Sequence, residues 1–166
     1  MSGEINYRRF AGSPAIKPRY LSDDNANKYY GYWTTTAGVI SQSLTDKMPN
    51  DAICALYNNL PVSGRMDFIF NAPQSIRNTV LDFWAKASNA LGLLVYTMPA
   101  AADFSSYTMR AINIGTAWAR YIAPMDTFIA STGNREFTLT NNRSLAFYNN
   151  GAQSDVYLSG VHLRRL

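Results

Sequence analysis

The chain has 166 residues, 47% of them hydrophobic and 13% aromatic, so it is long enough to bury a substantial core and is not disordered as a whole. The amino terminus lacks the apolar run of a secretory signal and the longest apolar stretch is too short to span a bilayer, so we expect a soluble protein made in a cytoplasm, with no membrane partner. Its single cysteine, Cys54, excludes an internal disulfide and a multi-cysteine metal site.

Charged residues make up only 16% of the chain, which has four lysines and two glutamates against eleven arginines and nine aspartates. Lys and Glu are depleted from protein interfaces, where Tyr and Arg are enriched, so this composition indicates a surface that becomes covered. The net charge is +4, with +3 in residues 1–21, +2 in residues 161–166 and −1 in the body between them. The excess positive charge therefore lies at the two ends.

Residues 1–21 contain glycines and prolines but no periodic apolar pattern, which predicts an extended arm. Aromatic and basic residues alternate along this arm: Tyr7, Arg8, Arg9, Phe10, Lys17, Arg19 and Tyr20. Such a segment can bind nucleic acid, can lie across a neighbouring subunit, or can be a solvated tail. We expect the arm to be followed by a single globular domain over residues 22–160 and a basic tail over residues 161–166.

The first half of the domain gives mixed signals. Apolar spacing between residues 29 and 40 fits a helix, although Gly31 and Gly38 weaken it. A short helix is expected over residues 50–60, and a short strand over residues 66–70.

The clearest helical pattern covers residues 72–91. Apolar residues recur there at the spacing of one helical face: Ile76, Val80, Phe83, Trp84, Ala87 and Leu91. Asp82 and Lys86 stand four residues apart on the other face, and Pro73 suits a first helical turn. We therefore place the centre of the fold in this helix.

Residues 104–123 fit either a helical or an alternating period, and we favour the helix. From residue 133 onward the runs EFTLT, SLAFY and DVYLSGVHL have strand character and are separated by turn clusters. The predicted fold is therefore mainly α, with a helical core around residues 72–91 and 104–123, an extended N-terminal arm and a small C-terminal antiparallel β element.

No sequence motif for catalysis, phosphate binding or metal binding occurs. The single histidine, His162, has Leu, Val and Arg as neighbours and no nucleophile beside it, which makes a catalytic role unsupported. We therefore expect no enzyme activity, no metal and no cofactor.

Arg110 and Arg120 lie in apolar, aromatic surroundings and each requires a partner if buried. The partner can be Asp103 or Asp126 of the same chain, a carboxylate of a neighbouring subunit, or a nucleic-acid phosphate.

In composition the chain resembles small viral coat and other virion structural proteins, which favour Arg over Lys, contain little His or Cys, and carry arms. This resemblance implies a self-assembling coat (capsid or nucleocapsid) subunit of the virion in a helical or ring-like assembly. Copies of itself would be its partners, with genomic RNA or DNA as a second candidate. The expected contact residues are Arg8, Arg9, Lys17, Arg19, Arg110, Arg120, Arg164 and Arg165, with Tyr7, Phe10 and Tyr20 as aromatic anchors.

Two alternatives stay open. A phage head-to-tail connector or tail-completion protein would have the same composition but form a closed ring. A small enzyme or binding module without a recognisable motif is the other.

Overall fold

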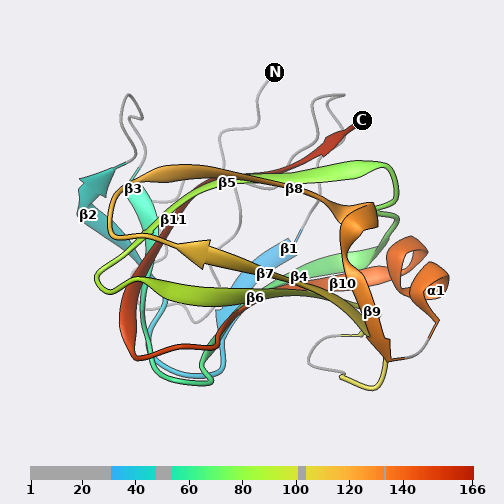
Figure 1. Ribbon diagram of the computed structural model, residues 1–166, viewed down its shortest axis with the longest axis horizontal. Coiled ribbons are helices and arrows are strands. Elements are labelled where there is room, and N and C mark those ends of the chain that lie inside the picture. Colours follow the sequence, from blue (N-terminus) through green and yellow to red (C-terminus); the bar gives the residue numbers. More distant parts are fainter. Residues whose placement is uncertain (1–30, 48–53, 101–103, 133) are drawn as a thin grey trace.

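The computed structural model describes residues 31–47, 54–100, 104–132 and 134–166, which form two antiparallel β-sheets packed face to face (Figure 1). Within these residues, helix is confined to α1 (Arg135–Thr140) and one 3₁₀ turn, η2 (Met125–Thr127). The prediction of a mainly α fold with a helical core is therefore wrong, because the core is a β-sandwich.

The first sheet has six strands among the described residues, in the spatial order β1-β4-β10-β6-β7-β9. Their bounds are Gly31–Thr35 (β1), Arg65–Gln74 (β4), Asn142–Asn149 (β10), Leu91–Met98 (β6), Tyr107–Ile114 (β7) and Ile129–Thr132 (β9).

The second sheet has five strands among the described residues, in the order β2-β3-β11-β5-β8. Their bounds are Ser41–Lys47 (β2), Cys54–Leu60 (β3), Ser154–Arg165 (β11), Thr79–Ala87 (β5) and Ala119–Pro124 (β8). Because β4 and β5 lie in different sheets, as do β7 and β8 and also β10 and β11, the chain repeatedly crosses between the layers.

Aromatic side chains fill the space between the sheets. Phe147 of the first sheet packs against Phe83 of the second with ring centroids 5.4 Å apart, and against Trp33 at 5.8 Å. Phe68 lies 5.5 Å from Trp33, and all four side chains are at most 1% exposed. The contact between Phe147 and Phe83 connects the two layers, and the other two lie among strands of the first sheet.

The predicted helix over residues 72–91 is instead the end of β4, the strand β5 and the start of β6. In β5, Leu81, Phe83 and Ala85 alternate into the core with a period of two, whereas Trp84 lies on the outer face and is partly exposed. The predicted stripe thus combines both faces of β5 with Ile76, which precedes that strand, and Leu91, which begins β6. Their combined spacing imitates a helical stripe.

The predicted helix over residues 104–123 contains β7, a turn and β8, so the alternating pattern was the right one here. Gly115 stands in the turn where the chain passes from the first sheet to the second. The helices expected over residues 29–40 and 50–60 are also wrong where described, because β1 and β3 occupy these segments.

Near the carboxyl end, the run EFTLT forms α1 rather than a strand, because the Asn134 side chain accepts a hydrogen bond from the Phe137 amide and caps the helix. The predicted strand over residues 66–70 lies within β4, and SLAFY and DVYLSGVHL lie within β10 and β11. Since β10 and β11 belong to opposite sheets, they do not form a separate C-terminal element.

The ends of the chain differ from each other. Residues 1–21, expected to be an arm, lie outside the described residues. Residues 161–165, expected within a basic tail, belong to β11, which pairs with β5 as far as Arg165 opposite Thr79.

The packing between sheets predicts a large cost for removing a ring that touches both layers. Phe147→Ala should lower the free energy of unfolding by about 3–5 kcal/mol, because it leaves a cavity between Trp33 and Phe83. Phe137→Ala is the matched control, since Phe137 on α1 is 51% exposed and its loss should cost less than about 1 kcal/mol. Urea unfolding of both variants measures the difference; equal effects would contradict the packing described here.

Candidate functional site

The outer face of the first sheet carries a cluster of four aromatic side chains, which we call the aromatic face. Tyr96 of β6 is at its centre, with ring centroids 5.1 Å from Tyr107, 5.3 Å from Phe104 and 6.0 Å from Tyr148. Tyr107 and Tyr148 come from β7 and β10, and Phe104 comes from the connection between β6 and β7. Three strands and one loop therefore place these rings together.

Strand alternation directs these rings outward. Val95 and Phe147 point into the main core, so their neighbours Tyr96 and Tyr148 emerge on the opposite face. In the register, Tyr96 lies opposite Ala146 of β10, a small residue that is fully buried. Tyr96 therefore has a small neighbour on β10, while Tyr148 lies two positions further along that strand on the same face.

Leu94, Met98 and Met109 extend the apolar part of this face. Burial raises the pKa of Tyr96, and the nearness of Tyr107 and Tyr148 raises it further. The Tyr96 hydroxyl group therefore stays protonated at neutral pH.

A buried ion pair borders the aromatic face on β4. Arg65 Nε donates to Asp67 Oδ1 at 2.6 Å, and the two side chains are 10% and 4% exposed. The two residues are two positions apart in a strand, so both lie on the outer face. The Arg65 guanidinium also lies 5.1 Å from the centre of the Phe104 ring, a cation–π contact that connects the ion pair to the aromatic cluster.

The surroundings of Asp67 alter the pKa of its carboxyl group. Burial raises the pKa of its carboxyl group, and the hydrogen bond and charge of Arg65 oppose that shift without cancelling it. The ion pair is thus expensive to bury, and it places one donor group and one acceptor group beside the rings.

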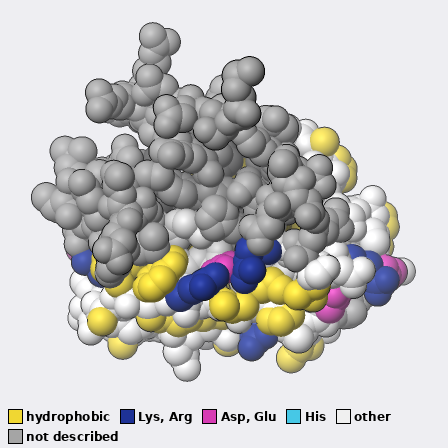
Figure 2. Space-filling model, turned by 90° about the horizontal axis from the view of Figure 1, so that it is seen from above, with side chains coloured by type: hydrophobic (Ala, Val, Ile, Leu, Met, Phe, Trp, Pro, Cys, Tyr) yellow, Lys and Arg dark blue, Asp and Glu magenta, His cyan; other side chains and the backbone are white. Residues whose placement is uncertain are grey.

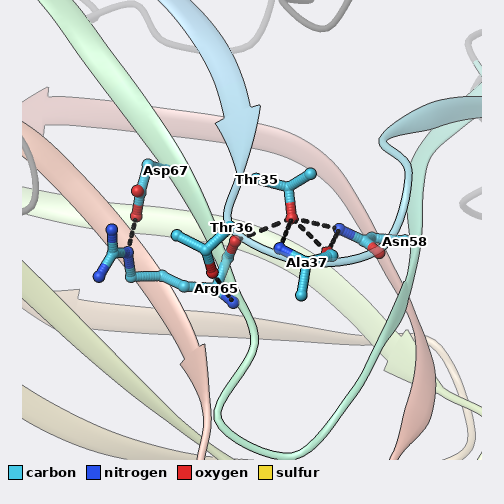
Figure 3. A network of polar contacts seen from close by, with 6 residues as sticks. All are labelled: Thr35, Thr36, Ala37, Asn58, Arg65 and Asp67. Atoms are coloured by element: carbon cyan, nitrogen blue, oxygen red, sulfur yellow. Dashed lines mark hydrogen bonds and ion pairs between the residues drawn. The ribbon is translucent and has the colours of Figure 1, made fainter.

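Figure 3 shows the polar network that contacts the backbone of Arg65. The Thr35 hydroxyl lies 2.6 Å from the Ala37 carbonyl oxygen and 2.9 Å from that of Arg65, and it accepts a hydrogen bond from Asn58 Nδ2 at 2.9 Å. The Arg65 amide donates to the Thr36 hydroxyl at 3.2 Å. Because Asn58 belongs to β3, this network connects the second sheet to the strand that carries the ion pair.

The outer face of the second sheet carries a different cluster, which we call the charged face. Arg120 of β8 binds Asp82 of β5 through two bonds, Nε to Oδ1 at 2.9 Å and Nη2 to Oδ2 at 2.5 Å, and Arg164 Nε lies 2.9 Å from Asp82 Oδ2. Figure 2 shows basic side chains beside an acidic one, with hydrophobic side chains on either side. Trp84 stands opposite Arg120 in the register.

The predicted contact residues are thus dispersed. Arg120 and Arg164 meet at Asp82, a partner within the chain that differs from the Asp103 and Asp126 considered for Arg120. Arg110 donates to the Thr127 hydroxyl at 2.7 Å. Arg165 pairs through its backbone with β5. The remaining expected contacts lie outside the described residues: Tyr7, Arg8, Arg9, Phe10, Lys17, Arg19 and Tyr20.

Sequence reasoning missed the aromatic face. Tyr96 and Met98 alternate along one strand and Tyr107 and Met109 along the next, a signal of period two that places each pair on one face. Their convergence with Tyr148 depends on strand register, which the sequence does not reveal.

Two other searches of the described residues were negative. No three His, Cys, Asp or Glu side chains come together there in an arrangement that could hold a metal ion. None of the helices in that part of the chain has the length and apolar character needed to cross a membrane.

No protein-family model and no curated protein matches the sequence. The folded chain does match solved structures. A family 11 carbohydrate-binding module from Clostridium thermocellum, solved with a β-1,3-1,4-mixed-linked tetrasaccharide, has a TM-score of 0.56 at 11% identity, covering 80% of this chain and 88% of that chain. The fold is that of carbohydrate-binding modules.

Two further matches agree. A family 30 module of a cellulosomal cellulase from the same organism has a TM-score of 0.55 at 13% identity, covering 74% of this chain and 79% of that one. A family 29 module, solved as a lysine-to-alanine variant with cellohexaose, has a TM-score of 0.55 at 11% identity, covering 90% of each chain.

These comparisons correct the functional expectation. The matched structures are binding modules with a β-sandwich, so the assignment to a virion coat subunit, with copies of itself or genomic nucleic acid as partners, is wrong. The binding module held open as an alternative fits this fold. In its fold, the chain resembles non-catalytic carbohydrate-binding modules.

The buried carboxyl group of Asp67 predicts a pH-dependent stability. Because burial raises its pKa above the unfolded value of about 3.9, the folded state holds the proton more tightly, and the stability this contributes is lost as the pH rises through the folded pKa. The free energy of unfolding of the wild type minus that of Asp67→Asn should therefore decrease as the pH rises from about 3.9 to the folded pKa of Asp67. Urea unfolding at a series of pH values measures it; a difference that grows with pH would contradict the assignment.

Proposed function

We propose that this chain is a non-catalytic carbohydrate-binding module that binds a neutral β-glucan chain at the aromatic face. The observation that carries the proposal is the cluster around Tyr96, on the outer face of a fold found in carbohydrate-binding modules. The ligands in two of the matched structures, a mixed-linked tetrasaccharide and cellohexaose, support the choice of a β-glucan.

The chemistry of the face suits a sugar chain. A pyranose ring has an apolar surface of C–H groups and an edge of hydroxyl groups, so it needs an apolar platform with polar groups at the border. Phe104, Tyr107 and Tyr148 supply partly exposed rings, because Phe104 is 38% exposed and both tyrosines are half-buried. Arg65 and Asp67 supply the donor and the acceptor beside them.

The site is also held in place before any ligand binds. Tyr96 makes edge-on contacts with Phe104, Tyr107 and Tyr148 at interplanar angles between 66° and 84°. Arg65 contacts Phe104 and is itself fixed by Asp67. Binding therefore orders few side chains, which lowers its entropic cost.

Removing one ring from the aromatic face should weaken glucan binding. For Tyr148→Ala, the dissociation constant for cellohexaose or a mixed-linked β-glucan tetrasaccharide, measured by isothermal titration calorimetry, should rise about 10-fold or more, because ~1.5–3 kcal/mol of aromatic burial is lost. Tyr148→Phe separates the contribution of the hydroxyl group from that of the ring.

The matched control is Phe137→Ala, which removes an exposed ring of α1 that is not part of the aromatic face. This variant should leave the dissociation constant unchanged. Binding of neither oligosaccharide by the wild type, or equal binding by Tyr148→Ala and the wild type, would refute this function at this face.

A further inference from the structure

The charged face contains two arginines that share one carboxylate. Asp82 is 4% exposed, and its two oxygens contact Arg120 and Arg164, so the acid lies beneath the two guanidinium groups. The hydrogen bond to Asp82 and its charge raise the pKa of Arg120, which therefore stays protonated. Of the two guanidinium groups, that of Arg120 is the more exposed, at 48% of its side chain against 32% for Arg164.

Arg120 retains hydrogen-bonding capacity beyond Asp82. A guanidinium has five N–H donors, and Arg120 uses one on Nε and one on Nη2 for Asp82. Its side chain is 48% exposed, and within the described part of the chain no other partner to it occurs. The remaining N–H groups can bind a second oxyanion, for which the planar guanidinium is well suited.

An aromatic residue stands across from this cation on the neighbouring strand. Trp84 is opposite Arg120 in the β5–β8 pairing and two residues from Asp82 on the same face. Its side chain is half-buried, and among the described residues it makes no aromatic contact or hydrogen bond. A partly exposed indole next to a partly exposed guanidinium is a platform with an anion contact at its edge.

We propose that the charged face is a second binding site, separate from the aromatic face, and that it takes a saccharide bearing carboxylate groups. The uronic acid ring would lie against Trp84, and its carboxylate would accept hydrogen bonds from Arg120, whose orientation Asp82 fixes. The two sites lie on the outer faces of opposite sheets, so each can be tested without the other. This proposal does not depend on glucan binding at the aromatic face.

The ring beside the cation is the reason to choose a saccharide over an acidic peptide. An acidic peptide would be attracted by charge alone, and its affinity would depend on Arg120 and on salt but little on Trp84. A uronic acid places an apolar ring face and a carboxylate within one residue, and so uses both groups.

The test uses a galacturonic acid hexasaccharide, with its methyl-esterified form as the neutral control ligand and poly-L-glutamate as the acidic peptide. For the full chain, calorimetry should show binding of the acid form at least about 10-fold tighter than the ester. Arg120→Gln and Trp84→Ala should each weaken it about 10-fold. Arg143→Gln, which removes an exposed arginine of the first sheet, is the charge-matched control and should change nothing.

Arg120→Lys controls for misfolding, because lysine keeps the positive charge beside Asp82 but cannot form the two-bond contact. This variant should also bind the uronate more weakly than the wild type does. Equal binding of acid and ester, or equal loss in Arg120→Gln and Arg143→Gln, would overturn the site. Tight binding of poly-L-glutamate that is insensitive to Trp84→Ala would overturn the saccharide assignment. Cellohexaose binding should be unaffected by Arg120→Gln, which keeps failure of one site distinguishable from failure of the other.

Discussion

The contact of Phe147 with Phe83 joins the two sheets, and both candidate surfaces depend on it. Because side chains alternate along a strand, fixing Phe147 in the core turns Tyr148 outward onto the aromatic face. In the same way, fixing Phe83 turns Asp82 and Trp84 outward onto the charged face. One layer of buried rings therefore determines the composition of two opposite surfaces.

The charged side chains of the two surfaces differ in burial, and the two surfaces therefore suit different ligands. Arg65 and Asp67 are both buried and balance one another, so they offer polar groups without a net charge beside the rings. In the charged face only Asp82 is buried, whereas Arg120 is half exposed and Arg164 about one-third exposed. The first arrangement suits neutral hydroxyl groups, and the second leaves N–H groups of the exposed Arg120 guanidinium where an anion can reach them.

The sequence indicates local structure better than it indicates pairing. The strands over residues 66–70 and in the SLAFY run follow from their β-branched and aromatic residues, whereas β5 has apolar residues on both faces and so imitates a helix. Arg120 has a partner within the chain, but this partner is Asp82, which the β5–β8 register brings near it, and not Asp103 or Asp126. The aromatic face could not be predicted for the same reason, because its rings converge only after three strands pair.

The scarcity of Lys and Glu has a physical explanation in these surfaces. Interfaces between proteins and carbohydrate-binding faces both need rigid apolar rings with few flexible charged chains, since ordering a flexible chain costs entropy. A chain rich in Tyr and Arg is thus compatible with either use, and composition alone pointed to assembly. What the structure adds is the arrangement of the rings. Tyr96 and its neighbours form one group bordered by a neutral ion pair, which is the combination of apolar surface and polar groups that the proposed sugar site requires.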